Sequence, residues 1–364
     1  MKRIERVSLS HGSGGEPSWR LISELFLKEF YNPFLSPLTD SAILNIYPSP
    51  NLTPTLSQRE RERGARGEEA IGEKSIKIAF TTDSYVVKPL FFPGGDIGKL
   101  AIAGTVNDLS VMGARPLFLS CGLIIEEGFE YSTLEKIILS MKKTASDSGV
   151  QIVTGDTKVV ERGAADKIFI STAGVGIVMD GVELKRERIM VGDIIIISGS
   201  IGDHGISVIS KREGIEFESE IESDCAPLNG LIIEVLESGA NIKFMRDPTR
   251  GGLAAALNEF AKGMNWGILL NETEIPIKES VRSVSDILGF DPLYIANEGK
   301  VVMIVSSADK NRVLKIIQNH PLGKDARIIG EIVSSPKEMV TLKTVVGGTR
   351  IVDMPSGEQL PRIC

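Results

Sequence analysis

Four aspartates lie near turns or near the ends of expected elements, a placement that suits the binding of a cation. Asp40 precedes an apolar run, Asp83 follows one in "TTDS", Asp108 lies in "TVNDLSVMGARP", and Asp156 lies in "TGDTK". Turn formation and helix capping explain any one of them taken alone. Four carboxylates that converged would repel each other and need cations. Oxygen-only ligands suit Mg²⁺, which is usually held by a few carboxylates together with substrate phosphates. Two interpretations are therefore open: ordinary turn residues, or a site for magnesium and a nucleotide polyphosphate.

Glycine-rich stretches offer further contacts to an anion. "HGSGG", residues 11–15, does not follow an expected strand, so it is not a dinucleotide fingerprint, and the sequence contains no P-loop. Taken alone, it is slightly more typical of a flexible loop. "RDPTRGG", residues 246–252, leads into an expected helix whose N-terminus can hold an anion. Capping of that helix by Asp247 or Thr249 explains the same pattern equally well.

The sequence ends on "GEQLPRIC", which places a thiol beside a free carboxylate at Cys364. Chain termini usually fray, so we expect this thiol on a mobile, exposed segment. One cysteine does not distinguish an accidental thiol from a nucleophile. Cys121, Cys225 and Cys364 are far apart in the sequence, which is no disulfide framework and fits a reducing cytoplasm.

Composition narrows the class of protein. The 364 residues suit two domains, and 48 acidic against 41 basic residues, a net charge of −7, give no electrostatic support to nucleic-acid binding. There is no Cys-x-x-Cys pair and the three histidines are scattered, which disfavours zinc. No apolar signal core follows the N-terminus and no apolar run is long enough to cross a bilayer. We expect a cytoplasmic protein without nucleic-acid or membrane partners.

The elements that must position these residues mix without strict alternation, which favours an α+β fold with mixed sheets packed against helices. We expect helices over residues 19–30, 97–112, 133–146, 206–211, 228–237, 253–262, 281–288 and 311–318. We expect strands over 42–47, 76–82, 117–125, 151–153, 168–177, 194–198, 267–270 and 301–305, with further short strands up to 352.

Polar segments divide the chain. Residues 48–74 have no apolar period and carry a charge run flanked by Pro and Gly, so we expect a flexible surface insertion. The polar stretch 179–193 marks a boundary between an N-terminal domain, 1–180, and a C-terminal domain, 181–348. Residues 349–364 are expected to form a mobile tail.

Several stretches of the sequence, taken together, are specific to one protein family. "SHGSGGE", "FTTDSYVVKPLFFPGGDIGKLAIAGTVNDLSVMGARP", "TGDTKVVERG", "SGSIGDHGI", "SDCAPL", "RDPTRGGLAAALNEFA", "DPLYIANEGK" and "GEQLPRIC" resemble, in order and over nearly the whole chain, the HypE family of hydrogenase maturation proteins. That family is part of the superfamily of aminoimidazole ribonucleotide synthetase and selenophosphate synthetase. The terminal "PRIC" is the most discriminating piece. The chain departs from the pattern in its 48–74 insertion and in Ser41, where a smaller residue is expected.

The resemblance implies a fold and a reaction. The fold has two α+β domains, of which the N-terminal one binds ATP and forms a homodimer through its sheets. The reaction is an ATP-dependent dehydration of an S-carbamoyl group on the C-terminal cysteine to a thiocyanate, which supplies cyanide to the iron of [NiFe]-hydrogenase. A carbamoyltransferase, HypF, loads the cysteine, and a HypC–HypD complex receives the cyano group.

The resemblance also implies roles for residues. The metal ligands for Mg²⁺ are Asp40, Asp83, Asp108 and Asp156, and the ATP site is made by these together with Asn107, Asp247, Gly14 and Gly15. Cys364 carries the group, while Lys158 and Glu298 handle protons and orient the thiocarbamate. Phosphorylation turns a poor leaving group, the amide oxygen, into a good one, and loss of the nitrogen protons then forms the C≡N bond.

Three alternatives are carried forward. A selenophosphate synthetase would favour a reactive cysteine near the N-terminal Gly-rich loop, but no cysteine precedes Cys121. A small-molecule kinase gives no reason for "PRIC". A non-enzymatic carrier, whose tail only ferries a group, needs no acidic metal site.

Overall fold

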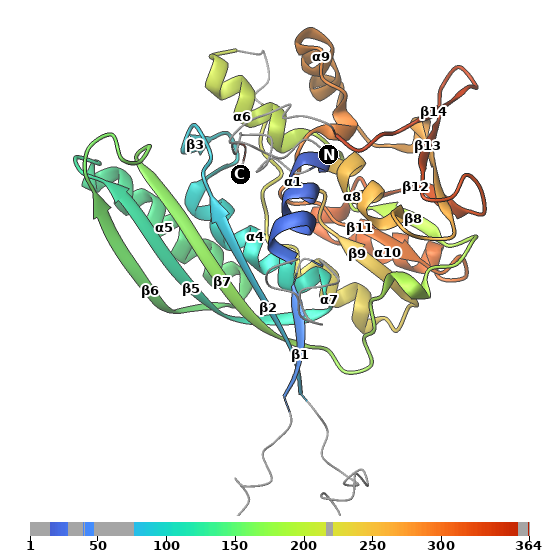
Figure 1. Ribbon diagram of the computed structural model, residues 1–364, viewed down its shortest axis with the longest axis horizontal. Coiled ribbons are helices and arrows are strands. Elements are labelled where there is room, and N and C mark those ends of the chain that lie inside the picture. Colours follow the sequence, from blue (N-terminus) through green and yellow to red (C-terminus); the bar gives the residue numbers. More distant parts are fainter. Residues whose placement is uncertain are drawn as a thin grey trace, which may run out of the picture.

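The computed structural model describes residues 15–27, 39, 41–46, 76–215, 221–355 and 363, arranged as two sheets with their helices (Figure 1). The predictions made for Gly14, Asp40, Cys364 and the 48–74 insertion lie outside the described residues.

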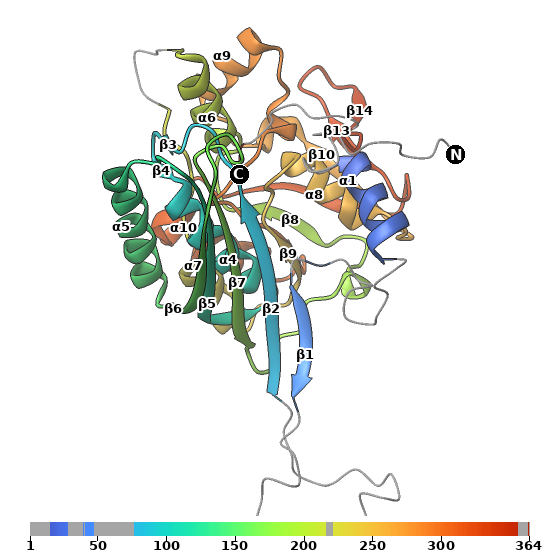
Figure 2. The ribbon, with the colours of Figure 1, turned by 60° about the vertical axis from the view of Figure 1, so that its left-hand side comes forward.

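The N-terminal sheet has the order β1-β2-β7-β5-β6. Its strands are β1 (Ala42–Ile46), β2 (Ile76–Tyr85), β5 (Ala114–Glu126), β6 (Gln151–Val160) and β7 (Ile168–Val178). Neighbours are antiparallel except β5 and β6. Figure 2 shows β1 and β6 at opposite edges of this sheet. Side chains alternate between its two faces, and one face packs on helix α4 (Ile97–Val111).

Helix α4 is buried along almost its whole length because both domains cover it. It packs against β2, β7 and α5 (Tyr131–Ser148) on one side and against α7 (Asn229–Glu237) and β9 (Ile242–Arg246) on the other. The Asp96 carboxylate caps its first turn by accepting from the N–H groups of Gly98 and Lys99. Asp96 closes a small hairpin, β3 (Phe91–Phe92) and β4 (Gly95–Asp96).

The C-terminal sheet has the order β14-β13-β10-β12-β8-β11-β9. Its other strands are β8 (Ile194–Ile197), β10 (Gly267–Asn271), β11 (Val302–Val305), β12 (Arg327–Val333), β13 (Val340–Lys343) and β14 (Thr349–Ile351). The remaining helices are α1 (Gly15–Leu21), continued by a π-helical turn η2 (Ile22–Phe26), α6 (Asp203–Glu213), α8 (Gly252–Ala261), α9 (Glu279–Leu288) and α10 (Lys310–Asn319). Short 3₁₀ turns are η4 (Arg186–Arg188), η5 (Glu272–Glu274), η6 (Pro292–Tyr294) and η7 (Pro321–Gly323).

The side chains of strand β8 show that helices cover both faces of this second sheet. Its four isoleucines are all buried, and they alternate between two cores. Ile195 and Ile197 join the cluster that contains Phe260 of α8, and the other two join the cluster that contains Leu231 of α7 and Ile317 of α10. A strand covered on both sides needs no polar face, so the sequence reads as one apolar run.

The expected fold class is confirmed, as two domains of mixed sheets and helices, and most expected elements are present. Strand β9 and the β3–β4 hairpin were not predicted. The 151–153 strand is longer than expected and runs as β6 to Val160. The expected start of the tail at 349 is wrong, because residues 349–351 pair with β13 as β14 and Val352 is buried. Within the described residues, no helix is both long and apolar enough to cross a membrane.

Candidate active site

Helix α4 of the N-terminal domain meets two segments of the C-terminal domain through Asn107. The Asn107 amide nitrogen donates to the carbonyls of Ala226 and Glu298, at 3.2 and 3.4 Å, and its oxygen accepts from the N–H of Leu228 at 2.7 Å. Asn107 is 1% exposed, so these contacts lie in a dry environment. Asn107 therefore holds the segments that carry the site together.

Asp83 and Asp108 come together around Tyr85. Asp83 lies inside β2, and not after the strand as expected, while Asp108 lies on α4. The Tyr85 hydroxyl donates to Asp83 Oδ2 at 3.1 Å, and Thr81 Oγ1 donates to Asp108 Oδ2 at 2.8 Å. Burial raises the pKa of the Tyr85 hydroxyl well above its usual value, and the charges of Asp83 and Asp108 raise it further. The structure thus brings together two of the predicted metal ligands.

Glu298 is the most perturbed carboxyl of this region. It is 3% exposed, and its Oε1 has no hydrogen-bond partner among the described residues. Burial raises the pKa of Glu298 well above its usual value, with further increases from the charges of Asp247 and Asp224. A buried carboxyl with a raised pKa and an oxygen without a hydrogen-bond partner among the described residues is suited to proton transfer.

Asp156 and Lys158 lie elsewhere. Both are inside the edge strand β6, and not after a strand as expected, each with a side chain 69% exposed. Lys158 Nζ lies 2.8 Å from Asp156 Oδ2, and its hydrogen bond and charge lower the pKa of Asp156. Strands β7 and β5 separate β6 from β2, a distance of about 14 Å at the usual strand spacing. One copy of the chain does not bring this pair to Asp83 and Asp108.

Two oxygen donors that fit Mg²⁺ are therefore present in one place, the carboxylates of Asp83 and Asp108. Mg²⁺ is commonly bound by one or two carboxylates plus phosphates, so these two are an adequate protein contribution to a metal–nucleotide site. The described residues contain no group of three or more His, Cys, Asp or Glu side chains arranged to hold a metal ion.

The glycine-rich segments adopt backbone conformations that require glycine. Gly15 begins α1 at φ +74°, and a Cβ there would lie 2.3 Å from the carbonyl oxygen of Pro355. Gly251 and Gly252 begin α8, also at positive φ. The proposed capping of α8 by Asp247 or Thr249 is wrong, because Gly251 occupies the cap without a side-chain bond. Asp247 is instead 6% exposed and lies near enough to Glu298 to raise its pKa.

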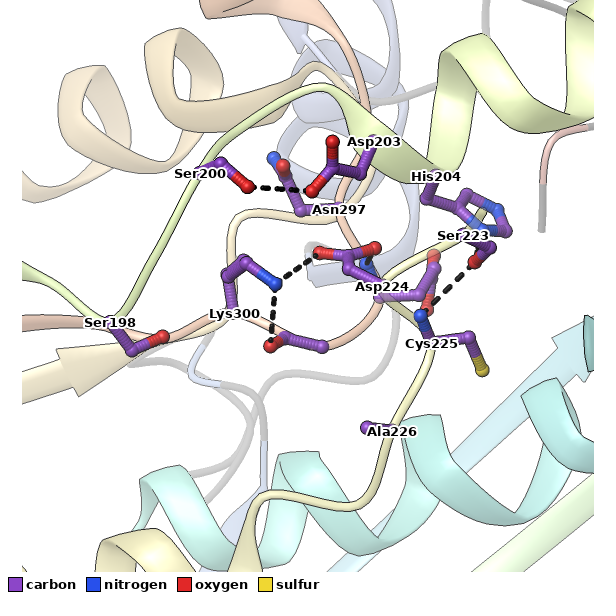
Figure 3. A network of polar contacts seen from close by, with 12 residues as sticks. Ser198, Ser200, Asp203, His204, Ser223, Asp224, Cys225, Ala226, Asn297 and Lys300 are labelled. Carbon is purple, nitrogen blue, oxygen red and sulfur yellow. Dashed lines mark hydrogen bonds and ion pairs between the residues drawn. The ribbon is translucent and has the colours of Figure 1, made fainter. Parts of the chain in front are cut away.

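Figure 3 shows a second polar network, which was not predicted from the sequence. Lys300 Nζ pairs with Asp224 Oδ2 at 3.3 Å, and the side chains are only 11% and 2% exposed. Asp224 Oδ1 accepts from the N–H of Glu298 at 3.0 Å. Burying a charge is costly unless the charge is paired. The Lys300–Asp224 pair is therefore part of the folded interior and not a chance contact between surface side chains.

The same network extends to α6. His204 Nδ1 lies 2.8 Å from Ser223 Oγ, and Asp203 Oδ2 accepts from Ser200 Oγ at 2.6 Å. These residues stand in "SGSIGDHG", "SDCAPL" and "ANEGK", three of the stretches that carry the resemblance. That is the signal through which they could have been found.

Two domain families match the chain. The AIR synthase related protein, N-terminal domain family matches residues 68–178, and the corresponding C-terminal domain family matches residues 190–343. A carbamoyl dehydratase HypE of Bradyrhizobium diazoefficiens is 48% identical over 359 residues, which cover 98% of this chain and 96% of that protein.

Two solved structures are similar over almost the full length. A chain in a HypE–HypF complex is 46% identical with a TM-score of 0.80, and the match covers 92% of this chain and 99% of that one. A hydrogenase maturation protein HypE in complex with ATP is 44% identical with a TM-score of 0.76, covering 97% of this chain and 98% of that one.

Proposed function

Because this chain belongs to the HypE family of hydrogenase maturation proteins, within the AIR synthase superfamily, we propose that it dehydrates an S-carbamoyl group on Cys364 to a thiocyanate with ATP. The observation that carries the proposal is Glu298, a buried carboxyl with an open oxygen and a raised pKa next to the joint between the domains. The cyano group then goes to the iron of [NiFe]-hydrogenase through a HypC–HypD complex.

ATP binding is supported by the relative that was solved with ATP and by the donors present here. The acidic pair Asp83 and Asp108 would hold Mg²⁺, which offsets phosphate charge when bound. The cap residue Gly251 lets the backbone turn into α8 close to Asp247. We place the nucleotide between these groups and Gly15.

The reaction requires a proton acceptor, and we assign this role to Glu298. ATP phosphorylates the carbamoyl oxygen, and phosphate then leaves as the C–N bond becomes triple. Two protons must leave the amide nitrogen, and the open Glu298 Oε1 is a suitable acceptor. Its raised pKa makes this carboxylate a stronger base than an ordinary surface carboxylate, which suits it to take a proton from a weak acid.

Lys158 can act on the same group only if a second copy supplies it. The outer face of the N-terminal sheet, which faces away from α4, carries exposed apolar residues. Phe80 and Phe118 are each 45% exposed and flank Val175 in adjacent strands. Lys158 pairs with Ile124, also 45% exposed, on that same face. An apolar sheet face of this kind is typical of an interface, and we propose a homodimer formed through it.

HypF is the proposed loading partner, because a similar chain was solved in complex with HypF. The carbamoyl group reaches Cys364 on that enzyme, so residues of the dehydration site are not needed for loading.

ATP consumption tests the proposal against its alternatives. Phosphate release by the purified protein with Mg²⁺ and ATP should depend strictly on prior carbamoylation of Cys364 and should be absent in Cys364→Ala. A non-enzymatic carrier would release no phosphate. A selenophosphate synthetase given selenide would release phosphate without carbamoylation, and a small-molecule kinase given its substrate would form ADP without carbamoylation. Either result would contradict the proposal.

A further inference from the structure

Ile363 lies inside the molecule. It is 4% exposed and belongs to the same buried cluster as Phe92, Val208 and Cys225. Phe92 comes from the β3–β4 hairpin of the N-terminal domain, while Val208 and Cys225 come from the C-terminal domain. Eleven residues, 352–362, separate Ile363 from the end of β14, so its burial here is not imposed by that strand.

A histidine holds the backbone of this residue. His204 Nε2 lies 3.0 Å from the carbonyl oxygen of Ile363, and His204 is fully buried. A carbonyl oxygen can only accept, so Nε2 carries the hydrogen. Burial lowers the pKa of His204, which favours the neutral ring, and Nδ1 is then an acceptor.

Ser223 fixes that tautomer. Its Oγ lies 2.8 Å from His204 Nδ1 and accepts from the N–H of Cys225 at 3.0 Å. The Ser223 hydroxyl therefore donates to Nδ1, and a polar chain runs from Cys225 through Ser223 and His204 to the Ile363 carbonyl. Every hydrogen-bonding group of the imidazole is used, as expected for a ring with one assigned orientation.

Both domains hold this histidine in place. Phe92 packs edge-on against its ring with centroids 5.3 Å apart, and the N–H of Ser223 donates to the carbonyl of Pro93 at 2.8 Å. The N–H of Gly202, just before α6, donates to Asn297 Oδ1 at 2.8 Å, and Asn297 immediately precedes Glu298. A change in how the domains sit would move both the histidine and the catalytic carboxyl.

The segment that holds His204 also reaches Glu298. Ser223 is followed by Asp224, whose Oδ1 accepts from the N–H of Glu298. The charge of Glu298 also contributes to the raised pKa of Cys225, which burial mainly causes. The docking point of residue 363 is thus joined to Glu298 by two consecutive residues.

We propose that His204, oriented by Ser223, is a positioning residue that docks the end of the chain by its residue-363 carbonyl and so presents Cys364 to Glu298. Since Cys364 is bonded to Ile363, whatever holds that carbonyl limits where the thiol can go. The purpose of the docking rests on the proposed function, whereas the docking itself can be measured without any turnover. One hydrogen bond and one apolar side chain form a reversible latch, which suits a tail that must also visit a loading enzyme.

The first test is alkylation of Cys364 by a small neutral maleimide in the unmodified protein, followed by intact mass. Cys121 and Cys225 are buried, so they should react slowly. His204→Phe keeps a ring of similar size but loses the donor, and we expect Cys364 to react about tenfold faster. His204→Gln retains a donor and an acceptor and should react nearly as slowly as wild type. His320→Phe, at a histidine that caps η7, is the matched control and should leave the rate unchanged.

Ile363→Gly removes the apolar side chain of the same latch and carries little risk to folding. We expect it to raise the alkylation rate, and the double variant with His204→Phe should react no faster than the faster single variant. Equal Cys364 reactivity in wild type, His204→Phe and Ile363→Gly would overturn the docking role.

Dehydration of the carbamoylated protein separates the two proposals. With docking and function both correct, His204→Phe slows single-turnover water loss while HypF loading keeps its KM, and His204→Gln restores the rate. If alkylation responds as expected but wild-type protein never loses water, the latch stands and the proposed function fails. If water loss is normal in His204→Phe, the positioning role is wrong.

Discussion

Glu298 and Lys158 are both expected to move protons, yet they lie in opposite surroundings. Glu298 is 3% exposed between two domains, with buried carboxyls around it. Lys158 is 69% exposed on an edge strand and is paired with its neighbour Asp156. The first region is assembled by one chain, because Asn107 bonds directly to the segment that carries Glu298. The second is presented on a sheet face that we propose a second copy covers.

A buried residue thus gains its environment when one chain folds, whereas an exposed residue gains it only when a second chain packs on it. The raised pKa of Glu298 comes mainly from desolvation, which folding of one chain already supplies. A lysine on an open strand acquires a comparable environment only when another surface packs on it.

The largest expected effect is on turnover. Glu298→Gln removes the proton acceptor and should slow water loss from the carbamoylated tail about 100-fold or more, while HypF loading is unchanged. Lys158→Ala should behave in the same way. Glu135→Gln, on the exposed surface of α5, is the control and should be active. Normal water loss in both site variants would contradict their roles.

Mixing the two inactive variants tests whether Lys158 acts on the site of the partner chain. If Lys158 acts on the partner's site, heterodimers of Glu298→Gln and Lys158→Ala chains contain one site with both residues intact. After subunit exchange, activity should return to about one quarter of wild type, as random pairing of two chains gives half heterodimers with one good site each. If Lys158 acts within its own chain, the mixture should stay inactive although heterodimers form.

Stability should respond in the buried region and not at the edge strand. Asn107→Ala leaves the N–H of Leu228 without its partner in a dry site and should lower the free energy of unfolding by about 1–3 kcal/mol, measured in urea. Asp156→Ala should leave the urea midpoint unchanged, since its ion pair with Lys158 is exposed. A stable Asn107→Ala protein that has lost ATP affinity would instead make Asn107 a direct nucleotide ligand.

The smallest expected effect is on the pH dependence of stability. The folded pKa of Glu298 is raised, so the stabilisation it provides is present below the ordinary carboxyl pKa and is lost as pH rises through the folded value. Glu298→Gln does not titrate, so its melting temperature should gain on wild type by a few degrees as pH rises from about 5 to about 8. Glu135→Gln should show no such trend.

Sequence patterns predicted the helices and strands best where apolar residues repeat regularly. The buried α4 and the apolar run of β8 are examples, because burial alone dictates their composition. Strand β6 was underestimated because all but its last residue are exposed, and its polar side chains gave no alternation. All four aspartates were expected to gather, and the structure brings Asp83 and Asp108 together but leaves Asp156 apart. The order of strands, which separates β6 from β2, cannot be derived from local spacing.

The polar network at Asp224, Lys300 and His204 was missed for a related reason. Buried and exposed charged residues are of the same amino-acid types, and only the fold shows which side chains are desolvated. Ser223 and Asp224 stand in "SDCAPL" without any helical or strand period, so their partners, about 20 residues before and 75 residues after them, could not be inferred from spacing.

The mass of the intact protein tests the central claim most directly. Wild-type protein is loaded by HypF and carbamoyl phosphate, freed of nucleotide, and then mixed with Mg²⁺ and ATP. We predict a carbamoyl adduct on Cys364 that loses the mass of one water after ATP is added, and an adduct of unchanged mass in the Glu298→Gln protein. An adduct that keeps its mass in wild type while ATP is bound, or that forms equally well on Cys364→Ala, would contradict the account.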